Sequence, residues 1–94
     1  MISYNFDYSR LARKFMLKHE SRIKQDKIED ALIHAIRRLT NEEVNSSDVI
    51  RMKGPFKEYC RLRIGDIRIV FKYSLGTIRI VSIHEIDFRG NIYL

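Results

Sequence analysis

The sequence YCRLRIGDIRIVF, residues 59–71, consists of two runs of alternating polar and apolar residues that meet at Gly65-Asp66. This pattern predicts two β-strands joined by a tight turn. Because successive strand side chains point to opposite faces, Tyr59, Arg61 and Arg63 share one face, and the apolar residues between them share the other. A strand holds such guanidinium groups in place, and their planar donor forks suit phosphate. RNA or another polyanion is therefore the first candidate ligand.

The chain is short and basic. Its 94 residues predict one domain, 1–94, with a two-layer core and without room for a deep enclosed cleft. The formal net charge of +6 favours nucleic acid or an acidic protein as a partner and does not distinguish the two. The single cysteine, Cys60, falls on the apolar side of its strand, so we expect it to be buried. No apolar run is long enough to cross a bilayer and no signal-peptide pattern is present, so we expect a soluble cytoplasmic protein that engages no membrane.

The first half of the sequence predicts a strand followed by two helices. Ile2, Tyr4 and Phe6 alternate with polar residues as in a strand, and Asp7 is the expected N-cap of the first helix. We expect Ser21 to cap the second helix. Two helices so close in sequence should form an antiparallel hairpin. The expected apolar stripes are Tyr8, Leu11, Ala12, Phe15 and Met16 in the first helix, and Ile28, Ala31, Leu32, Ala35, Ile36 and Leu39 in the second.

The second half of the sequence predicts the sheet. Residues 41–48 form a polar loop, and residues 49–52 form either a short strand or an extended lead-in. After the hairpin, Leu75-Gly76 is expected to make a second turn. Residues 77–86 are rich in Ile and Val and should form a central strand, covered on both faces or lying at the core of the sheet. The predicted fold class is α+β, with the order β-α-α-β-β-β and a helical hairpin packed on an antiparallel-dominated sheet.

Several segments together resemble one family. The Met52-Lys53-Gly54 element, the hairpin, the strand rich in Ile and Val, and a terminal pair, Arg89 and Tyr93, are similar to the RelE/ParE superfamily of toxins from type II toxin-antitoxin systems. The similarity covers nearly the whole chain; the hairpin motif is distinctive, whereas the helices match in pattern and length. The resemblance implies a RelE-like fold and two possible activities. RelE-type members cleave mRNA in the ribosomal decoding site, and ParE-type members poison DNA gyrase.

The resemblance also implies a set of catalytic residues. Arg61 and Arg63 occupy the places of two basic residues before the turn, and Arg68 occupies that of an arginine after it. Arg89 and Tyr93 correspond to an arginine and a tyrosine near the C-terminus. Every one of these positions carries usable chemistry, which favours the RelE branch. In the best-known branch the pair before the turn is lysine, and here it is arginine.

The implied reaction is attack of a ribose 2′-hydroxyl on its adjacent phosphate, with no metal and no cofactor. Arg61 and Arg68 would clamp the phosphate, Arg89 would approach the leaving 5′-oxygen, and Tyr93 would stack on a base. Arg63 stands at the place of the general base, although a guanidinium is effectively always protonated.

The identity of the proton acceptor stays open. The carboxylate of Glu85, the imidazole of His84 and the ribosome are alternatives to Arg63. For His84, which interrupts an apolar strand, a hydrogen-bonded structural role is the plainer interpretation. Arg61 and Arg63 could likewise serve solubility alone, and Tyr93 could cover a sheet edge.

Further residues are candidate RNA contacts. Lys53 and Lys57 flank the break before the hairpin, and Tyr59 can stack on a base. The resemblance implies an acidic antitoxin that folds on binding as one partner, and the ribosome and mRNA as others. Operator DNA would be bound only through the antitoxin complex.

The expected function is therefore that of a toxin acting as a ribosome-dependent mRNA endoribonuclease. One alternative is a ParE-like inhibitor of DNA gyrase, which is a protein binder rather than an enzyme. The other is a ribosome-independent ribonuclease or a catalytically silent RNA-binding relative.

Overall fold

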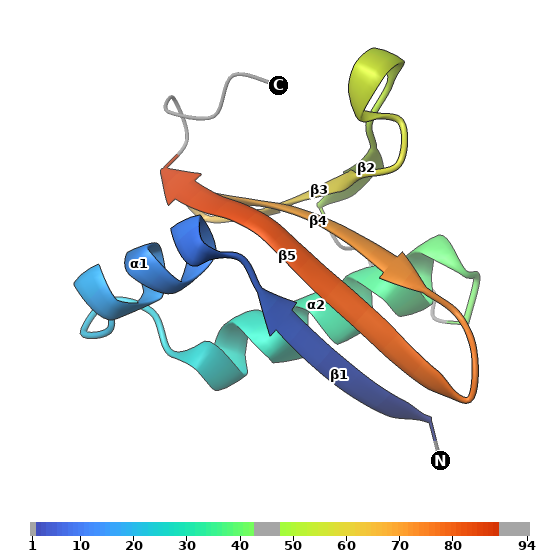
Figure 1. Ribbon diagram of the computed structural model, residues 1–94, viewed down its shortest axis with the longest axis horizontal. Helices are drawn as coiled ribbons and strands as arrows, with labels where there is room; N and C mark the ends of the chain where they lie inside the picture. Colours follow the sequence, from blue (N-terminus) through green and yellow to red (C-terminus); the bar gives the residue numbers. More distant parts are fainter. Residues whose placement is uncertain (1, 43–47, 89–94) are drawn as a thin grey trace.

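A single mixed sheet, with strand order β1-β5-β4-β3-β2, forms the centre of the protein (Figure 1). The computed structural model describes residues 2–42 and 48–88. β1 pairs with β5 in parallel, and the other described strand pairs are antiparallel. The strands are β1 (Ser3–Tyr8), β2 (Val49–Arg51), β3 (Cys60–Ile64), β4 (Ile67–Ser74) and β5 (Ile78–Phe88).

This architecture confirms the predicted α+β class and the antiparallel-dominated sheet. The predicted order omits β2, which the sequence left open as a strand or an extended lead-in. Its three residues pair with β3 at the sheet edge. A strand this short shows no period of its own, so only the pairing identifies it.

Two helices, α1 (Arg10–Lys18) and α2 (Gln25–Leu39), cover one face of the sheet. Neither is long and apolar enough to cross a membrane, and this holds for every helix in the described ranges. The predicted stripe of α2 is confirmed, because Ile28, Leu32, Ala35 and Ile36 are fully buried. Cys60 is buried as expected. The largest buried side chains of the sheet that join this core are Phe71, Ile69, Ile83 and Val81.

The start of α1 differs from the prediction. Asp7 is not a cap; it lies in β1, which continues to Tyr8 because Tyr8 still pairs with Ile83 of β5. Ser9 is the N-cap, and its Oγ accepts a hydrogen bond from the Ala12 backbone N–H at 3.1 Å. Leu11, expected in the apolar stripe, is 59% exposed, since Ala12 and Phe15 face the core and Leu11 lies off that line.

The start of α2 also lies later than predicted. Ser21 does not cap it; Lys24 occupies the N-cap position without a side-chain hydrogen bond. The backbone N–H groups of Arg22 and Ile23 both donate to the carbonyl of His19, at 2.9 and 3.1 Å. Ser21 therefore lies within this extra turn, before the start of α2. The apolar side chain of Ile23, which follows, is buried in the core.

The strand rich in Ile and Val, β5, lies inside the sheet between β1 and β4. This confirms the predicted alternative of a strand at the core of the sheet. The other alternative, burial on both faces, is wrong. Ile78 is 50% and Ile80 46% exposed, because the helices cover only the face to which Val81 and Ile83 point. The face opposite the helices is called the open face below.

A β-bulge interrupts β5. Phe71 of β4 lies opposite Ile83, whereas the preceding Val70 lies opposite Glu85, so His84 is an extra residue in β5. In a strand of unbroken alternation, Glu85 would point into the core, because it lies two residues after Ile83. The bulge instead returns Ile86 to the core and directs Glu85 to the open face.

Two polar contacts tie the helical layer to the sheet. Arg79, only 8% exposed, donates to Glu42 Oε2 at 2.5 Å and to the hydroxyl of Tyr4 at 2.9 Å. The hydroxyl of Tyr8 donates to Glu29 of α2 at 2.7 Å. The Arg79 hydrogen bond lowers the pKa of Glu42, and burial together with the Glu29 carboxylate raises the pKa of Tyr8.

The buried stripe of α2 predicts a large difference between two leucines. Leu32→Ala removes a fully buried side chain and should lower the free energy of unfolding by about 2–5 kcal/mol. Leu17→Ala removes a side chain that is 73% exposed and should change it by less than about 0.5 kcal/mol. Urea unfolding followed by circular dichroism measures both, and equal losses would contradict the described core.

The Glu42–Arg79 pair predicts a pH-dependent contribution to stability. The pKa of Glu42 is lower in the folded state, so the pair stabilises the fold above the ordinary glutamate pKa of about 4.3 and loses this effect as the pH falls through the folded value. Glu42→Gln should therefore lower the melting temperature at pH 7, and its difference from the wild type should shrink on acidification. Glu20→Gln, which alters an exposed glutamate, should show no such convergence.

Candidate nucleic-acid interface

The arginines of the hairpin gather on the open face of the sheet. In β3, Cys60 and Leu62 are buried while Arg61 and Arg63 point to the other side, as the alternation predicts. The turn at Gly65, whose φ is 57°, then folds β4 back so that Arg68 lies directly opposite Arg63. The structure thus brings these three arginines together.

A small depression marks this cluster. It is lined by Asp48, Ile50, Arg61, Arg63 and Arg68. Val70, opposite Arg61, is fully buried although its side chain lies on the open face. Arg61 therefore has an apolar cross-strand neighbour on each side, Ile50 and Val70, and electrostatic interactions beside apolar side chains are stronger than in bulk water.

Asp48 is the residue of this cluster that sequence reasoning missed. It was assigned to the polar loop, but it immediately precedes β2, and β2 pairs with β3 so that Asp48 meets Arg63. The two side chains form a hydrogen-bonded ion pair, and the Arg63 backbone N–H donates to the Asp48 carbonyl at 2.9 Å. The one sequence signal for its role is an acidic residue directly before a possible strand. The sequence does not show with which strand that segment pairs, so it does not predict the contact with Arg63.

A row of four charged side chains crosses the sheet at this level, with two arginines between two aspartates. Arg63 and Arg68 lie side by side, with Asp48 next to Arg63 and Asp87 of β5 opposite Arg68. We call these four residues the charged row. Its formal charges cancel. Arg61, half-buried beside the row, forms no ion pair with any residue in the described ranges, so it is the cation best placed to receive an anion.

The remaining predicted RNA contacts lie at some distance from this row. Tyr59 shares the open face with Arg61, and its ring contacts that of His84 with centroids 5.2 Å apart. Lys53 and Lys57 are exposed on the connection between β2 and β3, at either side of a short 3-10 turn, η1 (Gly54–Phe56). They do not line the depression.

The two alternative proton acceptors on β5 differ in placement. His84, expected to be a structural histidine within the strand, is exposed; it follows the buried Ile83 and is the extra residue of the bulge. Glu85 is half-buried on the open face and lies opposite Val70 of β4. Val70 in turn lies opposite Arg61 of β3. Asp48 lines the depression together with Arg61, whereas Val70 lies between Arg61 and Glu85.

Arg89 and Tyr93 lie outside the described residues, so their assigned roles stay predictions. Within residues 2–42 and 48–88, no group of three His, Cys, Asp or Glu side chains could hold a metal ion.

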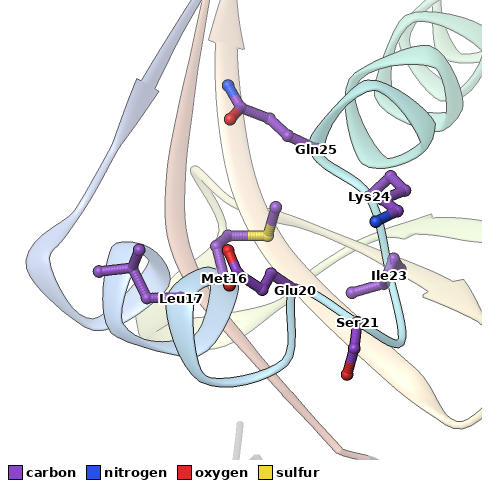
Figure 2. Close-up of a pocket in the computed structure, with 7 residues that line it drawn as sticks. All are labelled: Met16, Leu17, Glu20, Ser21, Ile23, Lys24 and Gln25. Carbon is purple, nitrogen blue, oxygen red and sulfur yellow. The ribbon is translucent and has the colours of Figure 1, made fainter.

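A larger hollow lies elsewhere, at the connection between α1 and α2 (Figure 2). Its volume is about 450 Å³, and Met16, Leu17, Glu20, Ile23 and Gln25 are among the residues that line it. It is separate from the arginine depression, because no residue lines both. Its charged lining residues are one carboxylate, Glu20, and one cation, Lys24, so this hollow lacks the several convergent cations that phosphate chemistry requires.

Comparison with solved structures identifies the fold. A YoeB/ParE toxin from Agrobacterium tumefaciens superimposes with a TM-score of 0.61 at 13% identity, over 89% of this chain and 97% of that chain. A copper-bound mutant toxin from Helicobacter pylori has a TM-score of 0.60 at 13% identity, over 99% and 100%. A YafQ mutant from E. coli has a TM-score of 0.59 at 13% identity, over 93% and 94%.

The fold is RelE-like. No family model and no curated protein sequence matches this chain, so the similarity to RelE-like toxins is one of structure at low sequence identity. It confirms the architecture that the hairpin motif implied. At this identity the similarity extends to the fold, and the chemistry of this RelE-like chain depends on its own side chains.

The Asp48–Arg63 pair predicts the effect of removing one negative charge. Asp48→Asn should raise the affinity for a single-stranded RNA oligonucleotide about fivefold, because one unit charge about 4 Å from a phosphate repels it by about 1 kcal/mol in water. Asp30→Asn makes the same charge change on α2 and should have no effect. Fluorescence anisotropy at fixed salt measures both, and equal affinities for the three proteins would contradict the placement of the RNA backbone at this row.

Proposed function

We propose that this RelE-like chain is the toxin of a type II toxin-antitoxin system and a ribosome-dependent mRNA endoribonuclease. The observation that carries the proposal is the convergence of Arg61, Arg63 and Arg68 around one depression together with the Asp48 carboxylate. Three fixed cations suit a phosphate whose charge increases during the reaction, and a carboxylate supplies a group that can accept a proton.

The reaction needs few parts. The ribose 2′-oxygen attacks the adjacent phosphorus while its proton passes to a base, and the bond from phosphorus to the 5′-oxygen breaks. The products are a 2′,3′-cyclic phosphate and a 5′-hydroxyl, which gains a proton. Arg61 and Arg68 stabilise the charge on the phosphate oxygens. As the resemblance implies, Arg89 assists the leaving 5′-oxygen and Tyr93 stacks on a base.

Asp48 is the proton acceptor that we favour. A guanidinium rarely gives up its proton, so Arg63 serves better as the partner that orients Asp48 than as the base. Glu85 is the second choice, since it lies on the open face in the cross-strand row of Arg61, beyond Val70. Under this assignment Asp48→Asn strengthens RNA binding and weakens cleavage, a combination that separates the two roles of Asp48.

The shallowness of the depression supports dependence on the ribosome. A depression of about 20 Å³ on a sheet surface has little surface of its own with which to orient the 2′-oxygen, the phosphorus and the leaving group in line. A ribosome that holds the message in an extended decoding site can provide this orientation. The protein then contributes mainly the charges.

An acidic antitoxin is the proposed protein partner. Besides the net charge, α1 presents Leu11 and Leu17, which are 59% and 73% exposed, on the helical side of the molecule. These side chains can anchor an apolar segment of a partner chain that folds on binding. Contact with operator DNA would occur through the antitoxin.

One observation favours a second candidate, inhibition of DNA gyrase. The charged row is formally neutral, and arginines already paired with carboxylates are less available to RNA. A ParE-like protein binder would use the same surface without needing phosphate chemistry. The next experiment distinguishes the two activities.

Arg61→Ala and Arg68→Ala should each reduce message cutting on programmed ribosomes about a hundred- to a thousandfold, because each removes one donor to the developing charge. Lys27→Ala removes one positive charge from α2 and should cut at the wild-type rate. Primer extension locates the cuts, and circular dichroism checks folding. Undiminished cutting by Arg68→Ala would refute the mechanism, broken DNA with intact message would support the gyrase alternative, and cutting of naked RNA would remove the ribosome requirement.

A further inference from the structure

A second cavity lies on the open face, beside the arginine depression. Its volume is about 190 Å³, and it is bounded by the end of β1, the start of α1 and the middle of the sheet. The residues that matter for its chemistry are Asp7, Ser9, Tyr59, Lys72, Ser82 and His84. We call it the Tyr59 pocket.

Aromatic rings form one wall of the Tyr59 pocket. The rings of Tyr59 and His84 are 5.2 Å apart between centroids and inclined at 43°. Lys72 Nζ lies 5.5 Å from the centroid of the Tyr59 ring, a distance typical of a cation–π contact. Tyr59 is half-buried and His84 is exposed, so the wall remains accessible. A half-buried tyrosine beside a cation is the kind of platform on which proteins stack single-stranded bases.

The opposite side of the pocket is polar. Asp7 and Ser82 lie opposite each other on β1 and β5, and Ser82 is in turn opposite Lys72 on β4. A carboxylate accepts hydrogen bonds only, and the exocyclic amino groups of cytosine, adenine and guanine donate them. A hydroxyl can complement either kind of group. The pocket therefore combines a stacking wall with acceptors for a base edge.

The spacing of residues at the start of β3 sets the distance from the pocket to Arg61. Tyr59 immediately precedes β3 and lies two residues before Arg61 on the same face, which corresponds to about 7 Å along an extended chain. One sugar can bridge that distance. A phosphate on Arg61 would thus place the base of a neighbouring nucleotide at the Tyr59 pocket.

We propose that the Tyr59 pocket binds one nucleobase of single-stranded RNA, with preference for a base that carries an exocyclic amino group. The proposal deepens the proposed function and rests on it for the position of the phosphate at Arg61. The cavity holds the volume of roughly six water molecules, which accommodates one base and excludes a base pair. Tyr59 provides stacking, Lys72 provides charge near the ribose-phosphate, and Asp7 selects the base edge.

The test uses the whole ¹⁵N-labelled protein and three small ligands: cytidine 5′-monophosphate, uridine 5′-monophosphate and ribose 5-phosphate. All three carry the same phosphate, and only the first two carry a base. Nuclear magnetic resonance titrations should show that every ligand shifts the signals of Arg61. The two nucleotides alone should also shift those of Lys72, Ser82 and His84, and cytidine monophosphate should bind more tightly than uridine monophosphate.

Variants separate stacking from folding. Tyr59→Ala should weaken cytidine monophosphate binding about five- to a hundredfold and leave ribose 5-phosphate binding unchanged. Tyr59→Phe keeps the ring and should bind like the wild type. Ser82→Leu fills the cavity from β5 without touching the core and should abolish the nucleotide-specific shifts. Asp7→Asn should remove the preference for cytidine over uridine monophosphate.

The outcomes distinguish this proposal from the function on which it builds. If the nucleotides and ribose 5-phosphate shift the same signals with the same affinity, the Tyr59 pocket is refuted while the arginine site stands. If only the pocket signals move, the pocket stands and the phosphate site at Arg61 is refuted. If no ligand shifts either group of signals, both are wrong.

Discussion

Burial of one sheet face beneath α1 and α2 determines where every side chain of the opposite face must point. Phe71 and Ile69 pack on the α2 stripe, so Arg68 and Val70, which alternate with them, are directed away from the helices. A shift of one residue in the pairing would exchange the two sets and place arginines in the core. The core therefore stabilises the fold and fixes the positions of the charges together.

The β5 bulge has the same kind of effect over a shorter range. By adding His84 between Ile83 and Glu85, it lets the strand contribute apolar side chains to the core on both sides of the irregularity. It also brings an imidazole out beside Tyr59 and a carboxylate to the open face. One extra residue thus gives the open face a carboxylate that a regular strand would direct into the core.

The electrostatics of the open face are more balanced than a net charge of +6 suggests. Asp48 and Asp87 accompany Arg63 and Arg68, whereas Arg61 lies between the apolar Ile50 and Val70, without an ion-pair partner in the described part of the chain. Carboxylates at these places weaken nonspecific binding of polyanions and orient the guanidinium groups. A site built this way favours an RNA that a larger partner has already positioned.

The amino-acid sequence by itself determined the period of each element: the α2 stripe, the alternation around Arg61 and Arg63, and the turn at Gly65-Asp66 were all predictable because local geometry sets them. Helix caps were less predictable. Pairing with β5 extends β1 through Asp7 to Tyr8, so Ser9 and not Asp7 is the N-cap of α1. Tertiary structure alone decided that Asp48 meets Arg63 and that His84 meets Tyr59. Those contacts depend on strand pairing and on a bulge between residues distant in the chain, and neither leaves a local pattern in the sequence.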